Sequence, residues 1–565
     1  MAGIKIRDFF NGRFFEIPKY QRGYAWEKNN VRDLFNDVTE AVETNSNHYI
    51  GTIVLSRDDD DDEKFHVVDG QQRITTITLM MAELVKHLEE RDSHFYERIY
   101  ISESDRHRLL PLSRDQKYFV DLLGGTVGEP QNKSQRFLSG AFEEIEAKVA
   151  AIPDKLKFLK SIEKLEIMEF VENSEGDAIR IFQTVNDRGK PLSNIEKAKS
   201  LLIYFSNRYL GKRLDNSIND IFSDIFEIYD DIKHIGESLN ITLIANKDFN
   251  EDNIMRYHFV SFSDEDYDPS ASQVLNFLKR RLTKMRSDAG DGDFSEMEAF
   301  IKEYASSLHD FFFACRQVVQ KAETNEKYYR LFVILNLSAT LYPLVTKMEA
   351  LGLIDKPLPK RSHYTFFDLI ELIDVRVYKT RGTDPKSHIA NFTHSLANRN
   401  EGDVENWLIW FNGHWMPKEL FQSYLWGNIY GNRALNHIFL TYSEHLSGKL
   451  NNVDQLKAFV GRVPTIEHVL SQTPKFAPKG LGFKNTEDFL SFEDSLGNLT
   501  PLEKSLNSAA RNKGATDKIE FYNRSKYKMT RLLGSAIDTA NGFNKKQIED
   551  RTTEVGTYCL ERWWC

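Results

Sequence analysis

The chain has 565 residues, of which 41% are hydrophobic and 28% charged, a balance that excludes a disordered protein. Its 30 glycines and 15 prolines fall below the roughly 40 and 28 that average usage predicts, which disfavours a turn-rich β-sandwich or barrel. The net charge of −10 argues against a protein that coats DNA through its overall field, and three cysteines without a CxxC pair exclude a zinc ribbon.

The apolar segments predict a protein of the cytoplasm that does not enter a membrane. The first residues contain no apolar stretch of the secretory type, so no export signal is expected. The longest apolar stretch, residues 331–345, is interrupted by Asn336, Ser338 and Pro343 and is too short to cross a bilayer. Together with the composition, this favours a predominantly helical α+β fold.

The first ninety residues carry both strand and helix patterns. Runs of β-branched and aromatic residues at 49–55 and 65–68 predict two strands. The acidic segment between them, residues 57–63, is expected to be a solvated hairpin loop, with a metal site as the alternative. From Ile74 to Leu88 apolar residues recur at helical spacing, which predicts an amphipathic helix of about four turns.

The rest of the chain reads as helices, with one further strand at 165–171. Helical patterns with polar joints continue to about residue 400, for example at 215–235 and 328–348, and a basic amphipathic helix at 277–286 either is solvated or faces DNA. Tryptophans and asparagines then cluster, which marks a boundary. The sequence thus predicts three parts, an N-terminal domain, a helical connector and a C-terminal domain, at residues 1–210, 211–400 and 401–565.

The segment 67–73 runs from the second strand into the start of that amphipathic helix. A helix start presents unpaired N–H groups and a positive dipole end, and Gly70 lets the backbone approach a phosphate. Arg73 can fork onto phosphate oxygens, and Asp69 could hold Mg²⁺ or position a water. This pattern indicates an anion site. The alternative is a tight turn in which Asp69 caps the helix and Arg73 forms a structural ion pair.

Three segments in a fixed order carry a resemblance to a known family: IPKYQRGYAW at 17–26, VVDGQQRITT at 67–76 and FQTVNDRGKPLS at 182–193. They resemble the N-terminal domain of GmrSD-type restriction factors, which is related to the ParB/sulfiredoxin fold, over about the first 210 residues. The resemblance implies that a nucleoside triphosphate (GTP, ATP, UTP or CTP) is bound with Mg²⁺ and hydrolysed. It implies a catalytic Asp69 and nucleotide contacts from Gly70, Gln71, Gln72, Arg73, Tyr20, Gln21, Arg22, Asn186 and Arg188. By type and spacing alone, Tyr20, Tyr24 and Trp26 either stack on a base or anchor the core.

A second constellation lies near the C-terminal end. Glu467 and His468 stand side by side, and GNLTPL follows at 497–502, then Asn507, Lys518 and Tyr522. A neutral histidine can take a proton from water while a divalent cation stabilises charge on a phosphodiester. His468 taken alone is more typical of a structural histidine, so the ordered set is what favours catalysis.

This order resembles the HNH (His-Me finger) nuclease domain, a ββα-metal fold, that accompanies the N-terminal module in GmrSD-like proteins. Carried over by position, His468 is the general base and Asn498 fixes the loop that orients it. Glu467 and Asn507 become ligands of Mg²⁺ or Mn²⁺, or close supports of such ligands. The family pattern His-x-x-Pro is broken here by Ser471, which loosens the turn after the base but removes no catalytic group.

Residues 502–548 contain ten Lys and Arg against four Asp and Glu, a local charge of +6 in an acidic chain. This segment predicts DNA contacts beside His468, through Lys513, Lys518, Arg524 and Lys526. The expected function is an NTP-dependent DNA endonuclease of antiphage defence that cuts phage or modified DNA, with nucleotide state regulating cleavage. The alternative is a ParB-like, nucleotide-gated DNA-binding switch with an inactive nuclease domain. The resemblance also suggests a homodimer.

Overall fold

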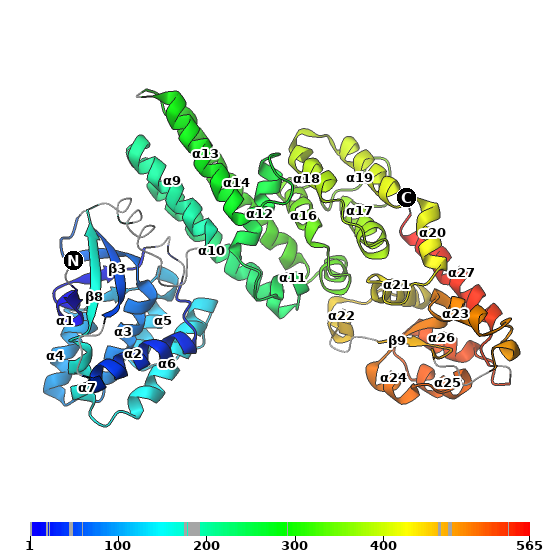
Figure 1. Ribbon diagram of the computed structural model, residues 1–565, viewed down its shortest axis with the longest axis horizontal. Helices are drawn as coiled ribbons and strands as arrows, with labels where there is room; N and C mark the ends of the chain where they lie inside the picture. The colour runs from blue at the N-terminus through cyan, green and yellow to red at the C-terminus, as the bar shows by residue number, and fades with distance from the viewer. Residues whose placement is uncertain are drawn as a thin grey trace. The chain divides into compact units, whose positions relative to one another are not determined.

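The computed structural model describes two compact, mostly helical units (Figure 1). The first comprises Met1–Asp230 and Ala271–His309, and the second comprises Asp231–Ser270 and Asp310–Cys565. The α+β, predominantly helical class is confirmed, whereas the three-part division of the chain follows different boundaries and stays a prediction. The described residues are 3–18, 21, 23–44, 49–58, 60–173, 178, 193–290, 292–460, 465–472, 477–540 and 542–564.

A mixed six-stranded sheet organises the first unit, with the strand order β1-β8-β3-β4-β2-β7. β3 and β4 form an antiparallel hairpin whose loop is the acidic segment, while β8 runs parallel to β3 and β2 parallel to β4. All three predicted strands are therefore confirmed. The strands are β1 (Ile4–Lys5), β2 (Phe14–Glu16), β3 (Tyr49–Arg57), β4 (Lys64–Asp69), β7 (Leu109–Leu110) and β8 (Glu166–Glu172), with β5 (Ser102–Glu103) and β6 (Arg106–His107) as a separate pair.

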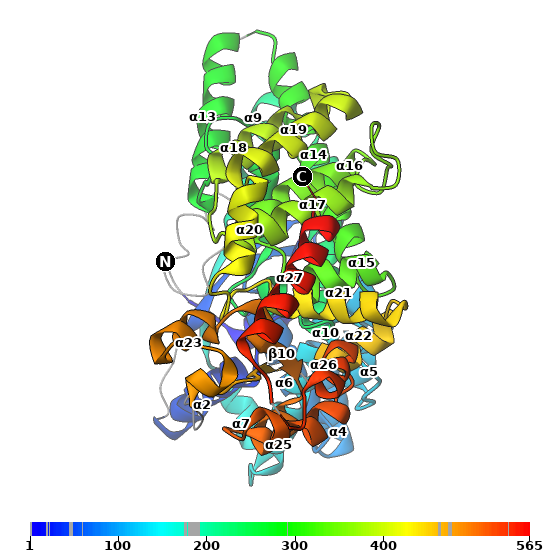
Figure 2. The same ribbon diagram turned by 90° about the vertical axis from the view of Figure 1, so that its right-hand side faces the viewer.

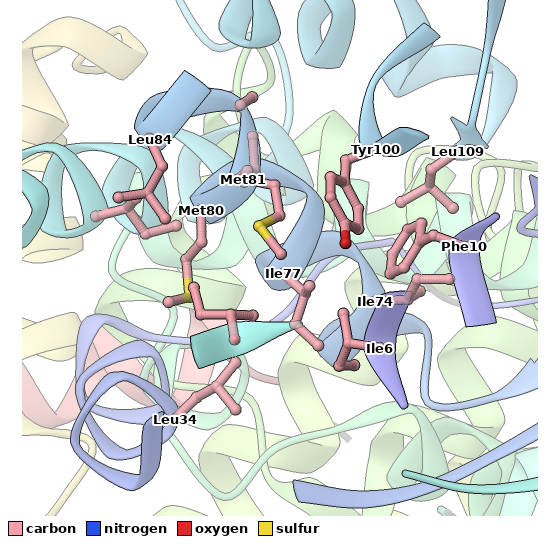
Figure 3. Close-up of a cluster of buried hydrophobic side chains, with 14 of the residues drawn as sticks. Ile6, Phe10, Leu34, Ile74, Ile77, Met80, Met81, Leu84, Tyr100 and Leu109 are labelled. Atoms are coloured by element: carbon pink, nitrogen blue, oxygen red, sulfur yellow. The ribbon is translucent and has the colours of Figure 1, made fainter. Parts of the chain in front are cut away.

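Helix α3 (Gln71–Val85) is the centre of the first unit's core (Figure 3). Every residue of α3 except Arg73 is buried, so the prediction of an amphipathic helix is wrong in this respect. The physical reason is that α4, α5, α6 and α7 all pack on it, and two of its threonines satisfy their hydroxyls inside the helix. Thr76 donates to the carbonyl of Gln72 and Thr78 to that of Ile74.

The remaining helices of the first unit include α10, which confirms the helical pattern predicted at 215–235. Two of them, α10 and α14, begin in the first unit and end in the second. The bounds are α1 (Ile6–Phe10), α2 (Lys28–Thr44), α4 (Glu90–Tyr100), α5 (Ser113–Leu123), α6 (Lys133–Ala150), α7 (Lys155–Ile162), α9 (Asn194–Leu210), α10 (Asp215–Ser238), α13 (Ala271–Ala289) and α14 (Ser295–Lys321).

The second unit opens with a helical array. The pattern at 328–348, predicted as helical, is divided by a break after Leu335, because Asn336 adopts φ 59° and Pro343 lies in the first turn of the next helix. The bounds are α11 (Thr242–Ala245), α12 (Glu251–Phe262), α15 (Glu326–Tyr329), η1 (Arg330–Ile334), η2 (Ala339–Leu341), α16 (Tyr342–Ala350), α17 (Phe366–Ile373), η3 (Asp374–Thr380), α18 (Lys386–Ser395), η4 (Leu396–Asn398), α19 (Glu401–Trp415), α20 (Lys418–Trp426), α21 (Leu435–Ser447) and α22 (Val453–Val460).

The C-terminal part of the second unit is built on a two-stranded antiparallel hairpin, in which His468 on β9 faces Leu499 on β10. Helix α24 follows β10 and packs against β9, and the long α27 packs on η6 and α20 (Figure 2). The bounds are β9 (Thr465–His468), η5 (Pro478–Leu481), α23 (Thr486–Glu493), η6 (Leu496–Asn498), β10 (Leu499–Leu502), α24 (Lys504–Ala510), α25 (Ala515–Asn523), α26 (Lys528–Ala536) and α27 (Lys545–Arg562). Throughout the part of the chain that the structure describes, no helix is both long and apolar enough to cross a bilayer.

Gly497 lets η6 lie directly on α27. Its N–H donates to the Thr552 hydroxyl at 2.9 Å, and Arg551 donates to the carbonyls of Gly497 and Leu499 at 2.8 and 2.7 Å. A Cβ at Gly497 would lie 1.9 Å from the carbonyl oxygen of Ile548. The absence of a side chain is thus a packing requirement for the loop that precedes β10.

We therefore expect Gly497→Ala to destabilise the second unit by about 2 kcal/mol or more, because backbone cannot yield cheaply to the added methyl group. Thermal or urea unfolding measures this. Gly480→Ala is the matched control, since no atom lies within 4 Å of the position its Cβ would take. Equal unfolding midpoints for the two variants would contradict this account of the η6 contact.

Candidate functional site

The turn between β4 and α3 is shaped by two glycines. Gly70 adopts φ 90°, and a Cβ there would lie 2.8 Å from Ile53 Cγ1. Gly51, at φ 125°, leaves the space that the Arg73 guanidinium fills, since a Cβ there would lie 2.5 Å from Arg73 Cζ. Any side chain at either position would be strained and would clash. The backbone at this turn is therefore close-packed around Arg73.

Arg73 is held in place by a backbone carbonyl. Its Nη1 donates to the carbonyl of Thr52 at 2.8 Å, and among the described residues it forms no ion pair within 4 Å. Burial lowers the pKa of Arg73, and the neighbouring Asp69 partly opposes this shift. A half-buried cation that lacks a paired anion attracts one. This observation supports an anion site at the start of α3.

Gln21 and residues 23–25 are fastened to this turn. Gln21 donates to the carbonyl of Val68 at 2.9 Å, and the Gln72 side chain accepts from Ala25 N–H at 2.8 Å. Tyr24 is buried, and its hydroxyl lies 2.7 Å from that of Thr76. Tyr24 is therefore a core anchor, as is the partly buried Trp26. The Gln72 side-chain amide is therefore used in hydrogen bonds to the backbone of Gly23 and Ala25.

The structure brings the predicted catalytic Asp69 to one turn with five of the predicted nucleotide-binding residues, Gly70, Gln71, Gln72, Arg73 and Gln21. Gln71 and Gln72 are both buried. The other four, Tyr20, Arg22, Asn186 and Arg188, lie outside the described residues.

In the second unit His468 pairs with Asp494, a residue that belongs to none of the sequence motifs. His468 Nε2 lies 2.8 Å from Asp494 Oδ1, and the ring of Tyr430 lies 4.5 Å from the imidazole, centroid to centroid. Asp494 follows α23, just before the GNL segment. Nothing in the sequence except the acidic pair Glu493-Asp494 beside that segment could have pointed to it, and nothing pointed to Tyr430.

Asn498 is fully buried and closes the loop after His468. Its Oδ1 accepts from Leu470 N–H at 2.8 Å, and its Nδ2 donates to the carbonyls of Leu470 and Glu493 at 3.0 and 2.7 Å. Because Glu493 and Leu470 flank Asp494 and His468, one amide holds both members of the histidine–carboxylate pair. The orienting role that the family resemblance implies for Asn498 stays a prediction.

Glu467 and Lys518 form a buried ion pair behind the strand. Lys518 Nζ lies 2.6 Å from Glu467 Oε1, and Tyr522 donates to the same carboxylate at 3.4 Å. Burial raises the pKa of Glu467 and lowers that of Lys518, and their attraction opposes both shifts. The prediction that Lys518 contacts DNA is corrected by this finding. The side chain is only 1% exposed, because its ammonium is needed to neutralise Glu467.

The other three residues predicted to contact DNA are exposed, in contrast to Lys518. Lys513, Arg524 and Lys526 are exposed, and the ammonium of Lys513 lies over the ring of Phe521 at 4.5 Å. Arg511 and Lys513 also line an open cavity of about 650 Å³ beside Val469, Leu470 and Ser471. An exposed basic surface therefore adjoins the residues that follow His468.

Two family descriptions match this chain. "GmrSD restriction endonuclease, N-terminal domain" matches residues 6–203, and "GmrSD restriction endonucleases, C-terminal domain" matches residues 419–556. The chain belongs to the GmrSD restriction endonuclease family. It is accordingly a restriction nuclease that acts on DNA. No curated protein matches the sequence.

The predicted metal ligands of this GmrSD-family chain do not form a free pair. The Glu467 carboxylate is engaged by Lys518, and Asn507 Nδ2 donates to the Thr465 hydroxyl at 2.6 Å. Across the described ranges no three His, Cys, Asp or Glu side chains gather as a metal site would require. A divalent ion at Glu467 would have to displace a buried ammonium, so these two residues as they stand do not fit a metal.

Asp494→Asn is expected to slow DNA cleavage by this GmrSD-family enzyme by about 10- to 100-fold, because an amide orients a histidine less strictly and does not stabilise its charged form. Initial rates of plasmid nicking measure the effect. Glu487→Gln, an equivalent neutralisation at an exposed position of the same α23 segment, serves as the control. A full rate with Asp494→Asn would show that the carboxylate does not assist His468.

Proposed function

We propose that this GmrSD-family protein is an NTP-dependent DNA endonuclease of the HNH type that cuts phage or modified DNA in antiphage defence. The observation that carries the proposal is the pairing of His468 with Asp494. His468 lies on a β-hairpin that is followed by a packed helix, and exposed basic side chains lie nearby. A histidine held in this way is suited to general-base catalysis.

We infer from this pair which nitrogen acts. An ionised carboxylate only accepts hydrogen bonds, so Nε2 of His468 donates to Asp494 and Nδ1 keeps its lone pair. Nδ1 then takes the proton of a water molecule that attacks the phosphodiester phosphorus. The imidazolium that forms is stabilised by the Asp494 carboxylate 2.8 Å away. Lys513, Arg524 and Lys526 hold the backbone phosphates of the DNA.

A divalent ion, Mg²⁺ or Mn²⁺, would supply charge stabilisation on the phosphate, but ligands other than Glu467 and Asn507 as they stand would have to hold it. Glu467 is paired with Lys518, and Asn507 donates to Thr465, so neither side chain is free to bind a metal. This supports a rival proposal, a ParB-like nucleotide-gated DNA-binding switch whose HNH domain is inactive. Plasmid nicking by the purified protein with and without each metal separates the two. Nicking favours the nuclease, and DNA binding without nicking favours the switch.

The N-terminal domain, which we propose to be ParB-like, would bind and hydrolyse the nucleotide at the β4–α3 turn. Gly70 makes the turn into α3 possible, the start of α3 offers a positive dipole end, and Arg73 offers a cation that forms no ion pair with the described residues. Asp69 would position the attacking water. The continuous helices α10 and α14 support coupling of nucleotide state to cleavage, since a helix transmits a rigid-body shift better than a flexible tether does. A homodimer would supply two nuclease sites for opposite strands.

His468→Ala should lower the cleavage rate by about 10²- to 10⁴-fold while NTP hydrolysis continues, because only the general base is lost. Plasmid cleavage and phosphate release from NTP, measured on the same preparation, report the two activities. His363→Ala, at an exposed histidine, is the control and should cut normally. Cleavage by His468→Ala at the control rate would remove His468 as the base.

Arg73→Ala should weaken NTP binding about ten-fold or more, since a charge-assisted contact contributes about 1.5–3 kcal/mol. Calorimetric titration gives the dissociation constants, and Arg57→Ala, at an exposed arginine at the end of β3, is the control. If nucleotide and nuclease sites are coupled, cleavage by Arg73→Ala also loses its response to NTP. Unchanged NTP affinity in a folded Arg73→Ala protein would refute the proposed nucleotide site.

A further inference from the structure

An exposed aromatic ring lies against His468 and belongs to none of the motifs. Tyr430 is 45% exposed, and its ring meets the imidazole of His468 at a centroid distance of 4.5 Å and an interplanar angle of 55°. It lies in the connection between α20 and α21, residues 427–433 (Gly-Asn-Ile-Tyr-Gly-Asn-Arg), termed here the Tyr430 loop. The loop therefore borders the proposed catalytic base.

The Tyr430 loop is fastened to Asp494, the partner of His468. Asn428 Nδ2 donates to Asp494 Oδ2 at 3.1 Å, and Ile429 N–H donates to the Asp494 carbonyl at 3.0 Å. The Ile429 side chain is buried, so it also fixes the loop at this end. The carboxylate thus holds the catalytic imidazole through one oxygen and the loop through the other.

The far end of the loop is anchored as well. Asn432 N–H donates to the carbonyl of Ile429 at 3.0 Å and closes a turn around Tyr430. The Asn432 side chain donates to the carbonyl of Thr380, also at 3.0 Å. With both ends fixed, the Tyr430 ring is placed before any ligand arrives, which lowers the entropic cost of using it in binding.

A tyrosine that served only to pack His468 would be expected to be buried, yet almost half of this ring is open to solvent. An exposed ring face can stack on any nucleobase, which makes it a sequence-tolerant contact for DNA. Three residues further on, Arg433 is exposed and carries a charge suited to a phosphate. The loop thus offers one stacking surface and one cation beside the base.

We propose that the Tyr430 loop is a DNA-contact element of the nuclease site. Tyr430 stacks on the nucleotide that adjoins the phosphodiester attacked with the help of His468, and Arg433 binds a phosphate of the same strand. This proposal rests on the proposed nuclease function of His468. It adds a binding contribution from outside the hairpin and helix α24.

The test compares DNA affinity and cleavage for Tyr430→Ala, Tyr430→Phe and Arg433→Ala in the full-length protein. Tyr424→Ala is the matched control, because Tyr424 is also exposed (36%) and lies on α20, outside the loop. Affinity for a fluorescent DNA duplex is measured at several salt concentrations in a His468→Gln background, and KM and kcat for cleavage are measured with His468 intact.

Tyr430→Ala is expected to weaken DNA binding and raise KM about ten-fold, while Tyr430→Phe and Tyr424→Ala stay within about two-fold of the parent. Arg433→Ala should reduce the salt dependence of binding by about one phosphate contact. Equal DNA affinity for Tyr430→Ala and Tyr424→Ala would overturn the proposal. So would a fall in kcat with unchanged KM and affinity, since the ring would then act through His468 alone.

Failure of the parent proposal looks different. If the protein with His468 intact cuts no DNA, the nuclease function fails, and the binding comparison still decides whether Tyr430 contacts DNA. If the protein cuts DNA but the Tyr430 variants match the control, only the Tyr430 loop proposal fails.

Discussion

The C-terminal site depends on the ion pair and the hydrogen bonds that the buried ammonium of Lys518 forms. A lone charge in the interior costs several kcal/mol, so each of its protons must meet an acceptor. Its acceptors are the Glu467 carboxylate, the carbonyls of His468 at 2.6 Å and Val469 at 3.4 Å, and the hydroxyl of Ser471 at 3.2 Å. They come from the residue before His468, from His468 itself and from the turn after it. One buried cation therefore fixes the backbone on both sides of the imidazole.

This arrangement also gives a physical account of the departure from the His-x-x-Pro pattern. A proline at position 471 would restrict the turn through its ring but would offer no side-chain acceptor. Ser471 gives up that restriction, and its hydroxyl accepts from Lys518 instead. Asn498 adds two hydrogen bonds to the backbone of Leu470, which lies between His468 and Ser471. The turn after His468 is thus held by hydrogen bonds where the family pattern relies on ring geometry.

Local patterns were enough to predict much of the fold. The strands around the acidic hairpin loop and the helix after Gly70 follow from runs of apolar residues and from turn chemistry, which act over a few neighbours. Burial of α3 on all sides, the break after Leu335 and the Asp494 contact depend on residues distant in sequence, which no local pattern contains. Lys518 was misplaced for the same reason, because a count of charges cannot tell a surface lysine from one that faces a buried carboxylate.

The two proposed sites differ in how their cations are paired, and this difference bears on what each can bind. Lys518 meets a carboxylate and three further oxygens, so its charge is neutralised inside the protein and is not available to an anion. Arg73 donates to one carbonyl and, within the described residues, forms no ion pair. Burial weakens the solvation of its charge, as the lowered pKa reflects, and an incoming phosphate would restore what solvent no longer supplies. The buried Lys518 and the half-buried Arg73 thus lead to opposite expectations. Lys518, which is paired, shapes a strand, and Arg73, which forms no ion pair with the described residues, marks the place where an anionic ligand gains most.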